Sequence, residues 1–498
     1  MTTAAVIGSG FGGLALAIRL QSAGIQTTLV EARDKPGGRA YVFENNGFKF
    51  DAGPTVITDP SCLEELFGLS GRKLSDYVEL LPVAPFYRLM WEDGYVFDYS
   101  NDDKSLFEQI EKKNPKDVAG YRKFLEFSEN VFREGYRKLG HEAFLDFRSM
   151  LQAAPQLMKY EAYRSVYTIV ARHIEDDQLR QAFSFHSLLV GGIPFKTSSV
   201  YALIHALEKE GGVWFPRGGT HALMRGLVKL FEDLGGTVRM GSKVETIVAD
   251  SGRVTGVHTA DGWSGRFDAV ASNGDVVHTY KDMLANHPRG QAMAKSMARR
   301  SWSASLFVIY FGLKGERSDV KQHTILLGNR YKELLGDIFR GGALAEDFSL
   351  YLHHPTATDP AMAPPGHSGF YVLSPVPHRG KLDIDWDKAA PAYAESILAA
   401  LERRVLPDLK RDLVTMRTFT PKDFSTELSA HLGSAFSLEP VLWQSAYFRT
   451  HNRDDVLSNL YFVGAGTHPG AGIPGVIGSA KATGKLMIAD LLHTRAAA

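Results

Sequence analysis

The sequence predicts an α/β fold in which one discontinuous domain is interleaved with a second, α+β domain. Two observations predict it. First, residues 3–30 form a short β run, a glycine turn, a stretch with helical recurrence of Leu and Ile, and a second β run. This is the order of a Rossmann-like βαβ unit. Second, segments typical of the nucleotide-binding unit return twice later in the chain, and two long blocks of a different pattern separate them. Two interleaved domains explain this alternation better than domains in succession.

The glycine turn after the first β run has the residues that a dinucleotide site needs. Gly8 permits a tight turn, Gly10 lets the backbone approach a pyrophosphate, and Gly13 lets the helix pack close to the strand. The N-terminus of the helix then offers unpaired N–H groups to the phosphates. Glu31 ends the second β run, where a carboxylate can accept hydrogen bonds from ribose hydroxyls. An acid at this position argues against NADP, because it disfavours a 2′-phosphate.

A second glycine turn follows Glu31 and indicates which dinucleotide is bound. The segment Lys35-Pro-Gly-Gly-Arg-Ala-Tyr41 contains Gly38 and Arg39. It resembles the signature of the flavin amine oxidase and phytoene desaturase superfamily, whose members bind FAD here. The resemblance implies that this turn and Arg39 approach the flavin side of the pyrophosphate. A surface loop is the alternative interpretation of these residues.

The domain boundaries follow from the alternating blocks. Residues 1–65, 211–286 and 432–498 are predicted to form the FAD-binding domain, and residues 66–210 and 287–431 the substrate-binding domain. In the first substrate block we expect helices over residues 103–113, 117–139, 143–158 and 177–189. In the second we expect strands over residues 306–312 and 369–374 and a helix over residues 387–406.

The first substrate block is rich in Phe and Tyr. Such side chains belong to ordinary cores, but a helical insertion with so many of them also suits an elongated apolar cavity or a membrane-facing surface. Residues 154–169 mix basic and apolar side chains as an interfacial helix does. A helix packed on its neighbours is the alternative for this segment.

The most specific motif lies near the C-terminus. Residues 459–480 form an apolar strand, then glycine-rich turns, then the start of a helix. Glycines there let the backbone lie flat against an isoalloxazine ring. With GSGFGGLALAIRL (8–20), FDAGPTVITDP (50–60), HSLLVGG (186–192), FPRGGT (215–220) and GAGTHPGAGIPGVIGSAKATG (464–484), nearly the whole chain resembles the bacterial-type phytoene desaturases of the lycopene-forming type.

That resemblance implies an FAD-dependent enzyme that introduces C=C bonds stepwise into phytoene to give lycopene. Hydride passes to flavin N5 and the adjacent carbon loses a proton. The expected partners are phytoene, partly desaturated carotenes and a lipid surface. The residues predicted to bind FAD are Gly8, Gly10, Phe11, Gly12, Gly13, Glu31, Arg33, Gly38, Arg39, Val244, Gly464, Ala465, Gly466, Gly475 and Val476.

The catalytic acid or base is less well defined by the sequence. By analogy within the family we predict Asp146 and Arg148, which lie two residues apart and so do not share a helical face. An exposed charge pair is the alternative. His468 either touches the flavin or makes a structural hydrogen bond. No metal site is expected, because His353 and His354 lack the spacing of metal ligands.

Composition sets further bounds on the function. The 498 residues carry 56 basic and 56 acidic side chains, which gives no support to a nucleic-acid partner. The single cysteine, Cys62, excludes an internal disulfide framework and fits a reducing compartment. We expect no signal peptide, no membrane-spanning helix, and a frayed tail over residues 494–498.

Because phytoene is a hydrocarbon confined to the bilayer, we expect a peripheral membrane enzyme on the cytoplasmic face of the cell membrane. The sequence predicts no oligomeric state. Three alternatives stay open: another carotenoid desaturase or oxidase, a flavin amine oxidase with a polar amine pocket, and a non-catalytic prenyl-lipid binder. The C-terminal motif disfavours the amine oxidase. The intact Gly8, Gly10, Gly13 and Glu31 argue against the lipid binder.

Overall fold

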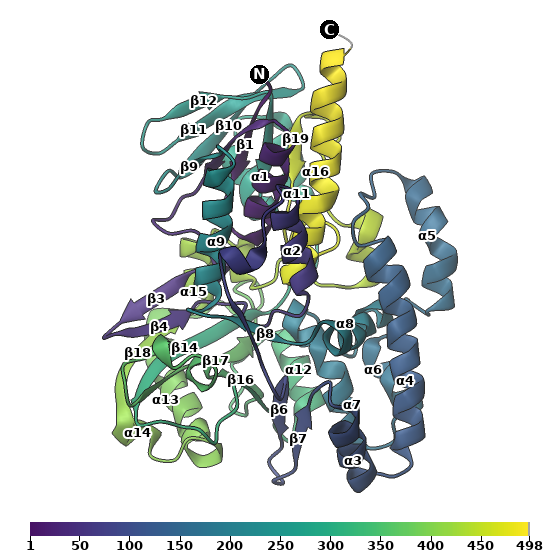
Figure 1. The fold of residues 1–498 in the computed structure, drawn as a ribbon, viewed down its shortest axis with the longest axis vertical. Helices are drawn as coiled ribbons and strands as arrows, with labels where there is room; N and C mark the ends of the chain where they lie inside the picture. Colours follow the sequence, from purple (N-terminus) through teal and green to yellow (C-terminus); the bar gives the residue numbers. More distant parts are fainter. Residues whose placement is uncertain (497–498) are drawn as a thin grey trace.

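The computed structural model describes residues 1–496 and contains a five-stranded parallel sheet in the order β19-β13-β1-β2-β9. All five strands come from the three blocks predicted for the FAD-binding domain. Both chain termini lie in this part of the molecule (Figure 1). Its strands are β1 (Thr3–Ile7), β2 (Gln26–Val30), β9 (Thr237–Arg239), β13 (Ala269–Ser272) and β19 (Leu460–Phe462).

Helix α1 (Phe11–Ser22) packs between this sheet and the long helix α16 (Ile473–Ala496). Residues 11–20 of α1 are all buried, as expected for a helix that is apolar on every side. Gly13 makes the close packing possible, because a Cβ there would lie 1.9 Å from the carbonyl oxygen of Gly8. Around the sheet lie α2 (Pro60–Gly68), α9 (Thr220–Asp233), α10 (Val276–His278) and α11 (Pro288–Met297).

Three small antiparallel units connect to this part. One is a three-stranded sheet whose first turn has Ser251 and Gly252 at positive φ, as a tight hairpin turn requires. The units are β10 (Val244–Asp250), β11 (Arg253–Thr259) and β12 (Ser264–Arg266); β3 (Val42–Asn45) with β4 (Phe48–Asp51); and β5 (Leu80–Pro82) with β8 (Trp214–Pro216).

A seven-stranded mixed sheet forms the centre of the second part, in the order β18-β14-β17-β16-β15-β6-β7. All of its strands come from the blocks predicted for substrate binding. They are β6 (Tyr87–Met90), β7 (Val96–Tyr99), β14 (Ser305–Lys314), β15 (His323–Leu326), β16 (Leu350–His353), β17 (His367–Val376) and β18 (Leu413–Phe419). The boundaries between the two domains stay a prediction.

Strand β14 shows how this sheet separates two environments. Phe307, Ile309 and Phe311 pack in a core with helix α13 (Trp386–Arg404). The alternate residues Val308 and Tyr310 face a large cavity on the other side. This follows from the two-residue period of a strand. The remaining helices of this block are α12 (Tyr331–Arg340), α14 (Leu409–Asp412) and α15 (Pro421–Glu427).

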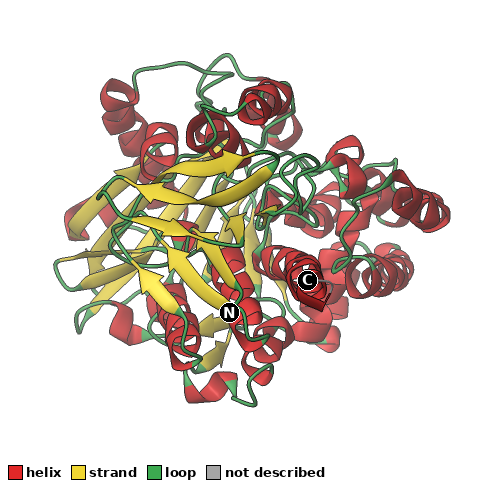
Figure 2. Cartoon of the chain, turned by 90° about the horizontal axis from the view of Figure 1, so that it is seen from above, coloured by secondary structure: helices red, strands yellow, loops and turns green. Residues whose placement is uncertain are grey.

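The helical block lies beside the sheets, and Figure 2 shows from above a group of helices to the right of the strands. It comprises α3 (Asp103–Lys113), α4 (Asp117–Val131), the π-helix η3 (Phe132–Lys138), α5 (Phe147–Lys159), α6 (Val166–His173), α7 (Asp177–Ser184), the 3-10 helix η4 (Phe185–Val190) and α8 (Leu203–Gly211).

The structure corrects two expectations in this block. The helix expected from residue 143 begins at Phe147, where Asp146 caps it. The interfacial segment over residues 154–169 is not one helix, because α5 ends at Lys159 and α6 begins only at Val166. At the other end of the chain, residues 494–496 continue α16. The predicted fraying of residues 497–498 lies outside the described residues.

Candidate FAD and substrate site

The glycine turns from the two ends of the chain meet around one side chain, Asn273. Asn273 comes directly after β13, and Gly8 comes directly after β1. Gly464 comes two residues after the end of β19. A Cβ at Gly10 would lie 2.9 Å from Asn273 Nδ2. A Cβ at Gly12 would lie 2.7 Å from Asn273 Oδ1, and a Cβ at Gly464 would lie 2.4 Å from the same oxygen. Ligands bind at the carboxyl ends of parallel strands. The sequence signal that could have identified Asn273 is therefore its position directly after the apolar run of β13.

Glu31 fixes the first glycine turn from the end of β2. Its Oε2 accepts hydrogen bonds from the Ser9 N–H (2.7 Å) and the Ser9 hydroxyl (2.6 Å). Its Oε1 accepts one from the Arg33 N–H at 2.9 Å. A carboxylate has about four acceptor positions, so the buried Glu31 keeps capacity for a ribose hydroxyl.

Arg39 lies in the second glycine turn and faces the same space. Gly37 and Gly38 have φ of +128° and +54°, which favour glycine. Arg39 Nη2 donates to the Ser434 carbonyl at 3.3 Å, whereas its Nε has no hydrogen-bond partner. Burial lowers the pKa of the guanidinium, and the Asp275 carboxylate opposes that shift. A guanidinium with spare donors is suited to a phosphate oxygen.

These groups line one end of a cavity of about 640 Å³. The predicted cofactor residues that line it are Gly8, Gly10, Phe11, Gly12, Glu31, Arg33, Gly38, Arg39, Val244, Ala465, Gly475 and Val476. Gly13, Gly464 and Gly466 do not line it, and Gly13 and Gly464 instead allow close backbone packing. Three features together fit FAD. They are the glycine turns, Glu31 at the end of β2, and Arg39, whose Nε has no hydrogen-bond partner.

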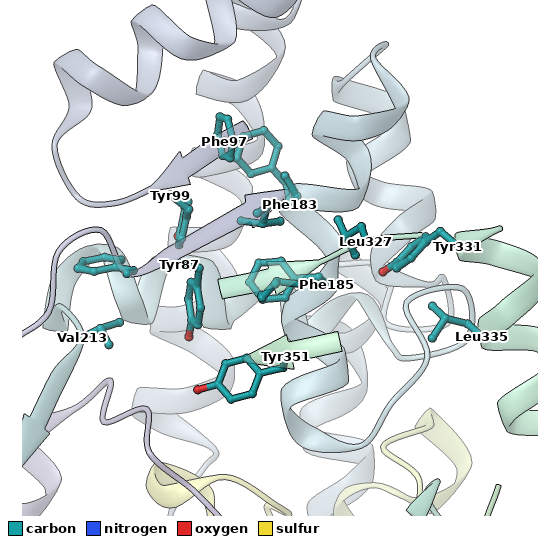
Figure 3. Close-up of a cluster of buried hydrophobic side chains, with 14 of the residues drawn as sticks. Tyr87, Phe97, Tyr99, Phe183, Phe185, Val213, Leu327, Tyr331, Leu335 and Tyr351 are labelled. Carbon is teal, nitrogen blue, oxygen red and sulfur yellow. The ribbon is translucent and has the colours of Figure 1, made fainter. Parts of the chain in front are cut away.

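The same cavity continues between the helical block and the seven-stranded sheet, where its wall becomes apolar. This wall includes Leu157, Leu189, Leu207, Val308, Leu335 and Phe339. Figure 3 shows part of the buried aromatic cluster beside it, where rings from β6, β7, η4 and β16 lie close together. An elongated apolar space therefore opens directly from the nucleotide end of the cavity.

The buried guanidinium of Arg449 stabilises the glycine-rich loop that follows β19. Arg449 Nη2 donates to the Ala465 carbonyl at 2.5 Å, and Nη1 donates to the Gln444 carbonyl at 3.4 Å. Burial lowers the pKa of this guanidinium. His468 lines the cavity, and its Nε2 lies 3.0 Å from the Leu139 carbonyl, so it makes the structural hydrogen bond. Burial lowers the pKa of His468 to about 4, and the ring is therefore neutral at pH 7.

The structure does not support the prediction of Asp146 and Arg148 as an acid/base pair. Both side chains are exposed, and neither lines the cavity. Asp146 is the N-cap of α5 and accepts a hydrogen bond from the Ser149 N–H at 2.8 Å. The analogy within the family pointed to charged residues near an aromatic helix. In the structure, the N-terminal end of α5, where Asp146 and Arg148 lie, faces solvent.

Within residues 1–496, no group of His, Cys, Asp or Glu side chains is arranged to hold a metal ion. Of the helices in the same range, none combines the length and the apolar character needed to cross a bilayer.

Comparison with known proteins identifies the family. The model of the flavin-containing amine oxidoreductases matches residues 11–488. The chain is 61% identical to the lycopene-forming phytoene desaturase of Pseudescherichia vulneris, across 99% of this chain and 100% of that protein. It is 59% identical to the same enzyme of Pantoea ananas, again across 99% and 100%. A solved putrescine oxidase shares the fold, with a TM-score of 0.65, 16% identity and 99% of each chain covered.

The chain therefore belongs to the flavin-containing amine oxidoreductases, and its cofactor is FAD. The likeness to putrescine oxidase concerns the fold alone, because the identity is only 16%. Within this family the chain belongs to the phytoene desaturases, and the family predicted from the motifs is confirmed.

Replacing Arg39 with Met is expected to weaken FAD binding about 10- to 100-fold, because a charge-assisted hydrogen bond to phosphate is lost. Titration of the apoprotein with FAD, followed by flavin fluorescence, measures this. Arg340, whose side chain is 72% exposed, provides the control R340M, with an unchanged Kd. An R39M protein that binds FAD as tightly as the wild type would remove Arg39 from the cofactor site.

Proposed function

We propose that the protein is an FAD-dependent desaturase that introduces C=C bonds stepwise into phytoene to give lycopene. The observation that supports this most directly is that one continuous cavity joins the FAD-binding turns to a long apolar wall. A hydrocarbon has no polar groups to match, so its binding depends on shape and buried apolar area. The relatives named lycopene-forming phytoene desaturases, at 59–61% identity over nearly full length, support the same substrate and product.

FAD, when bound, supplies an acceptor for a hydride taken from the saturated carbon pair. The chain's own part is to orient the substrate and to exclude water. A C–H bond is a poor hydride donor, so the rate depends strongly on the position of the carbon relative to the cofactor. Side chains of the sheet, such as Val308 and Tyr310, and of α8, such as Ile204 and Leu207, line the cavity from two sides. This arrangement supports an extended chain that moves along the cavity between successive desaturations.

Purified FAD-loaded protein incubated with phytoene in liposomes is expected to give lycopene, with less desaturated carotenes as intermediates. Separation of the extracted carotenes, with absorbance spectra of each, measures this. A product that stops at a less desaturated carotene would retain the desaturase class and contradict the lycopene-forming assignment. Oxidation of an amine with release of peroxide, without any change in phytoene, would instead favour an amine oxidase.

We further propose that the protein docks peripherally on the cytoplasmic face of the cell membrane. Helix α5 supports this, because it has two apolar faces. Ala153 and Leu157 line the cavity, whereas Leu151 and Met158 are 58% and 65% exposed. Lys159, at the end of the same helix, adds an exposed basic group suited to anionic lipid.

A second segment supports the same docking surface. Phe147 of α5 packs against Tyr447, with ring centroids 5.7 Å apart. Close to Tyr447 in the chain, Trp443 is 63% exposed, whereas Leu442 lines the cavity. Exposed apolar side chains thus surround the part of the cavity that α5 and residues 442–448 enclose. A substrate dissolved in the bilayer can enter there without crossing water.

The double substitution L151E/M158E is expected to abolish flotation of the protein with anionic liposomes, because two charges replace the apolar surface that enters the lipid. Flavin content should stay at one per chain. A matched control is V414E/M416E on β18, where the side chains are 43% and 44% exposed and lie across the molecule from α5 (Figure 1). Undiminished flotation of L151E/M158E would contradict docking through α5.

A further inference from the structure

Glu208 differs from every other carboxylate that lines the cavity. It lies on α8 and its side chain is fully buried. Glu31 and Asp275 lie at the nucleotide end, where backbone N–H groups donate to them. Glu134 and Glu427 are partly exposed and form ion pairs with Lys or Arg. Within residues 1–496, Glu208 has no such pair with Lys or Arg.

The two oxygens of Glu208 have different surroundings. Oε1 accepts a hydrogen bond from the Tyr87 hydroxyl at 2.6 Å. Oε2 has no hydrogen bond within the described part of the chain, although His186 Nε2 lies 3.0 Å away. Both ring nitrogens of His186 also lack a hydrogen bond there. In Figure 3 the hydroxyl end of Tyr87 lies toward Tyr351, which lines the cavity.

A second buried group lies directly behind this one. His205 is on the same helix, three residues before Glu208, and its ring lies 6.0 Å from that of His186. The hydroxyls of Tyr99 and Tyr121 lie 2.9 Å and 3.0 Å from its two nitrogens. Burial lowers the pKa of His205 well below its usual value. Groups that can hold or pass a proton therefore continue from Glu208 away from the cavity.

The substrate that we propose has no polar group that could pair with Glu208. A hydrocarbon offers no hydrogen bond, and a buried carboxylate oxygen that accepts none costs free energy. Buried groups of this kind are concentrated at functional sites. A carboxylate in an apolar wall interacts strongly with a positive charge that develops nearby, because little water screens it.

We propose that Glu208 is the base that takes the proton in each desaturation; this inference rests on the proposed function. When bound, FAD would supply the acceptor for the hydride that leaves one carbon of the saturated pair. The C–H bond of the adjacent carbon then breaks, its electron pair forms the C=C bond, and its proton goes to Oε2 of Glu208. The neighbouring His186 Nε2 receives the proton next and returns Glu208 to the carboxylate form. Tyr87 is a positioning residue, which holds the carboxylate through Oε1.

The test is anaerobic reduction of the FAD in the holoenzyme by phytoene, measured as bleaching of flavin absorbance. E208Q keeps the size of the side chain and the acceptor for Tyr87, but it removes the base. We expect bleaching at least about 100-fold slower than in the wild type, since general base catalysis contributes a factor of this order. Flavin content and reduction by dithionite should be unchanged, which separates a lost proton step from a damaged cofactor site.

The control variant is E210Q, two residues along the same helix, where the carboxylate is 58% exposed and pairs with Arg137. It should bleach at the wild-type rate. A third variant, E208A, should bleach slowly and recover at least about tenfold with sodium formate but not with sodium chloride, because formate replaces the missing carboxylate. A merely structural role for Glu208 would not give this recovery.

A bleaching rate of E208Q within threefold of the wild-type rate would overturn the proposal. If E208Q fails to bind FAD, the formate experiment decides, and equal rates with formate and chloride would overturn it. Failure of the proposed function has a different signature, because the wild-type holoenzyme would then not bleach with phytoene at all. Bleaching by the wild type with no loss in E208Q would leave the desaturase intact and remove only Glu208.

Discussion

The close packing of three strand ends around Asn273 is the constraint on which the rest of the structure depends. β1, β13 and β19 are parallel neighbours, so their carboxyl ends meet at one edge of the sheet. The backbone at Gly12 and Gly464 comes so near to the Asn273 amide that no side chain fits between them. The first and last segments of the chain are thereby held against each other. The cofactor site is complete only when both are folded.

This constraint also explains the order of polar and apolar surface in the cavity. At the strand ends, backbone N–H groups, Glu31 and Arg39 present charge and donors to a dinucleotide. Beyond them, the seven-stranded sheet and the helical block supply an apolar wall, because alternate residues of β14 face inward. The FAD-binding turns and the apolar wall therefore border one continuous cavity. Glu208 is a carboxylate in that wall, and the full burial of its side chain makes it distinctive.

The nucleotide end was predictable from the sequence because its signals are local. A strand, a glycine turn and an acid lie within 31 residues, and β1 begins and β2 ends at the limits of the predicted unit, residues 3 and 30. The C-terminal turn was also recognisable, since its backbone has positive φ at Gly464, Gly470 and Gly472. Neither Asn273 nor Glu208 has a comparable local pattern. Asn273 depends on contacts with residues more than 180 positions away on both sides, and Glu208 on a strand, a 3-10 helix and a helix that meet only in the fold.

The substrate side shows the same limit. Charge near an aromatic helix suggested Asp146 and Arg148, but a helix N-cap and a catalytic carboxylate look alike in sequence. Only the direction of the side chain separates them, and tertiary packing sets that direction. The period of a helix also could not show that residues 154–169 are two helices, because the turn between α5 and α6 contains no glycine.

The most direct test of the account is the flavin content of G464A. Gly464 has a φ of +98°, and a Cβ there would lie 2.4 Å from Asn273 Oδ1. We expect that this single methyl, more than 400 residues from Gly8 in the chain, leaves a folded protein that purifies without FAD. The measurement is flavin absorbance per chain, beside a circular dichroism spectrum. A folded G464A with one FAD per chain would contradict the claim that both chain ends build one cofactor site.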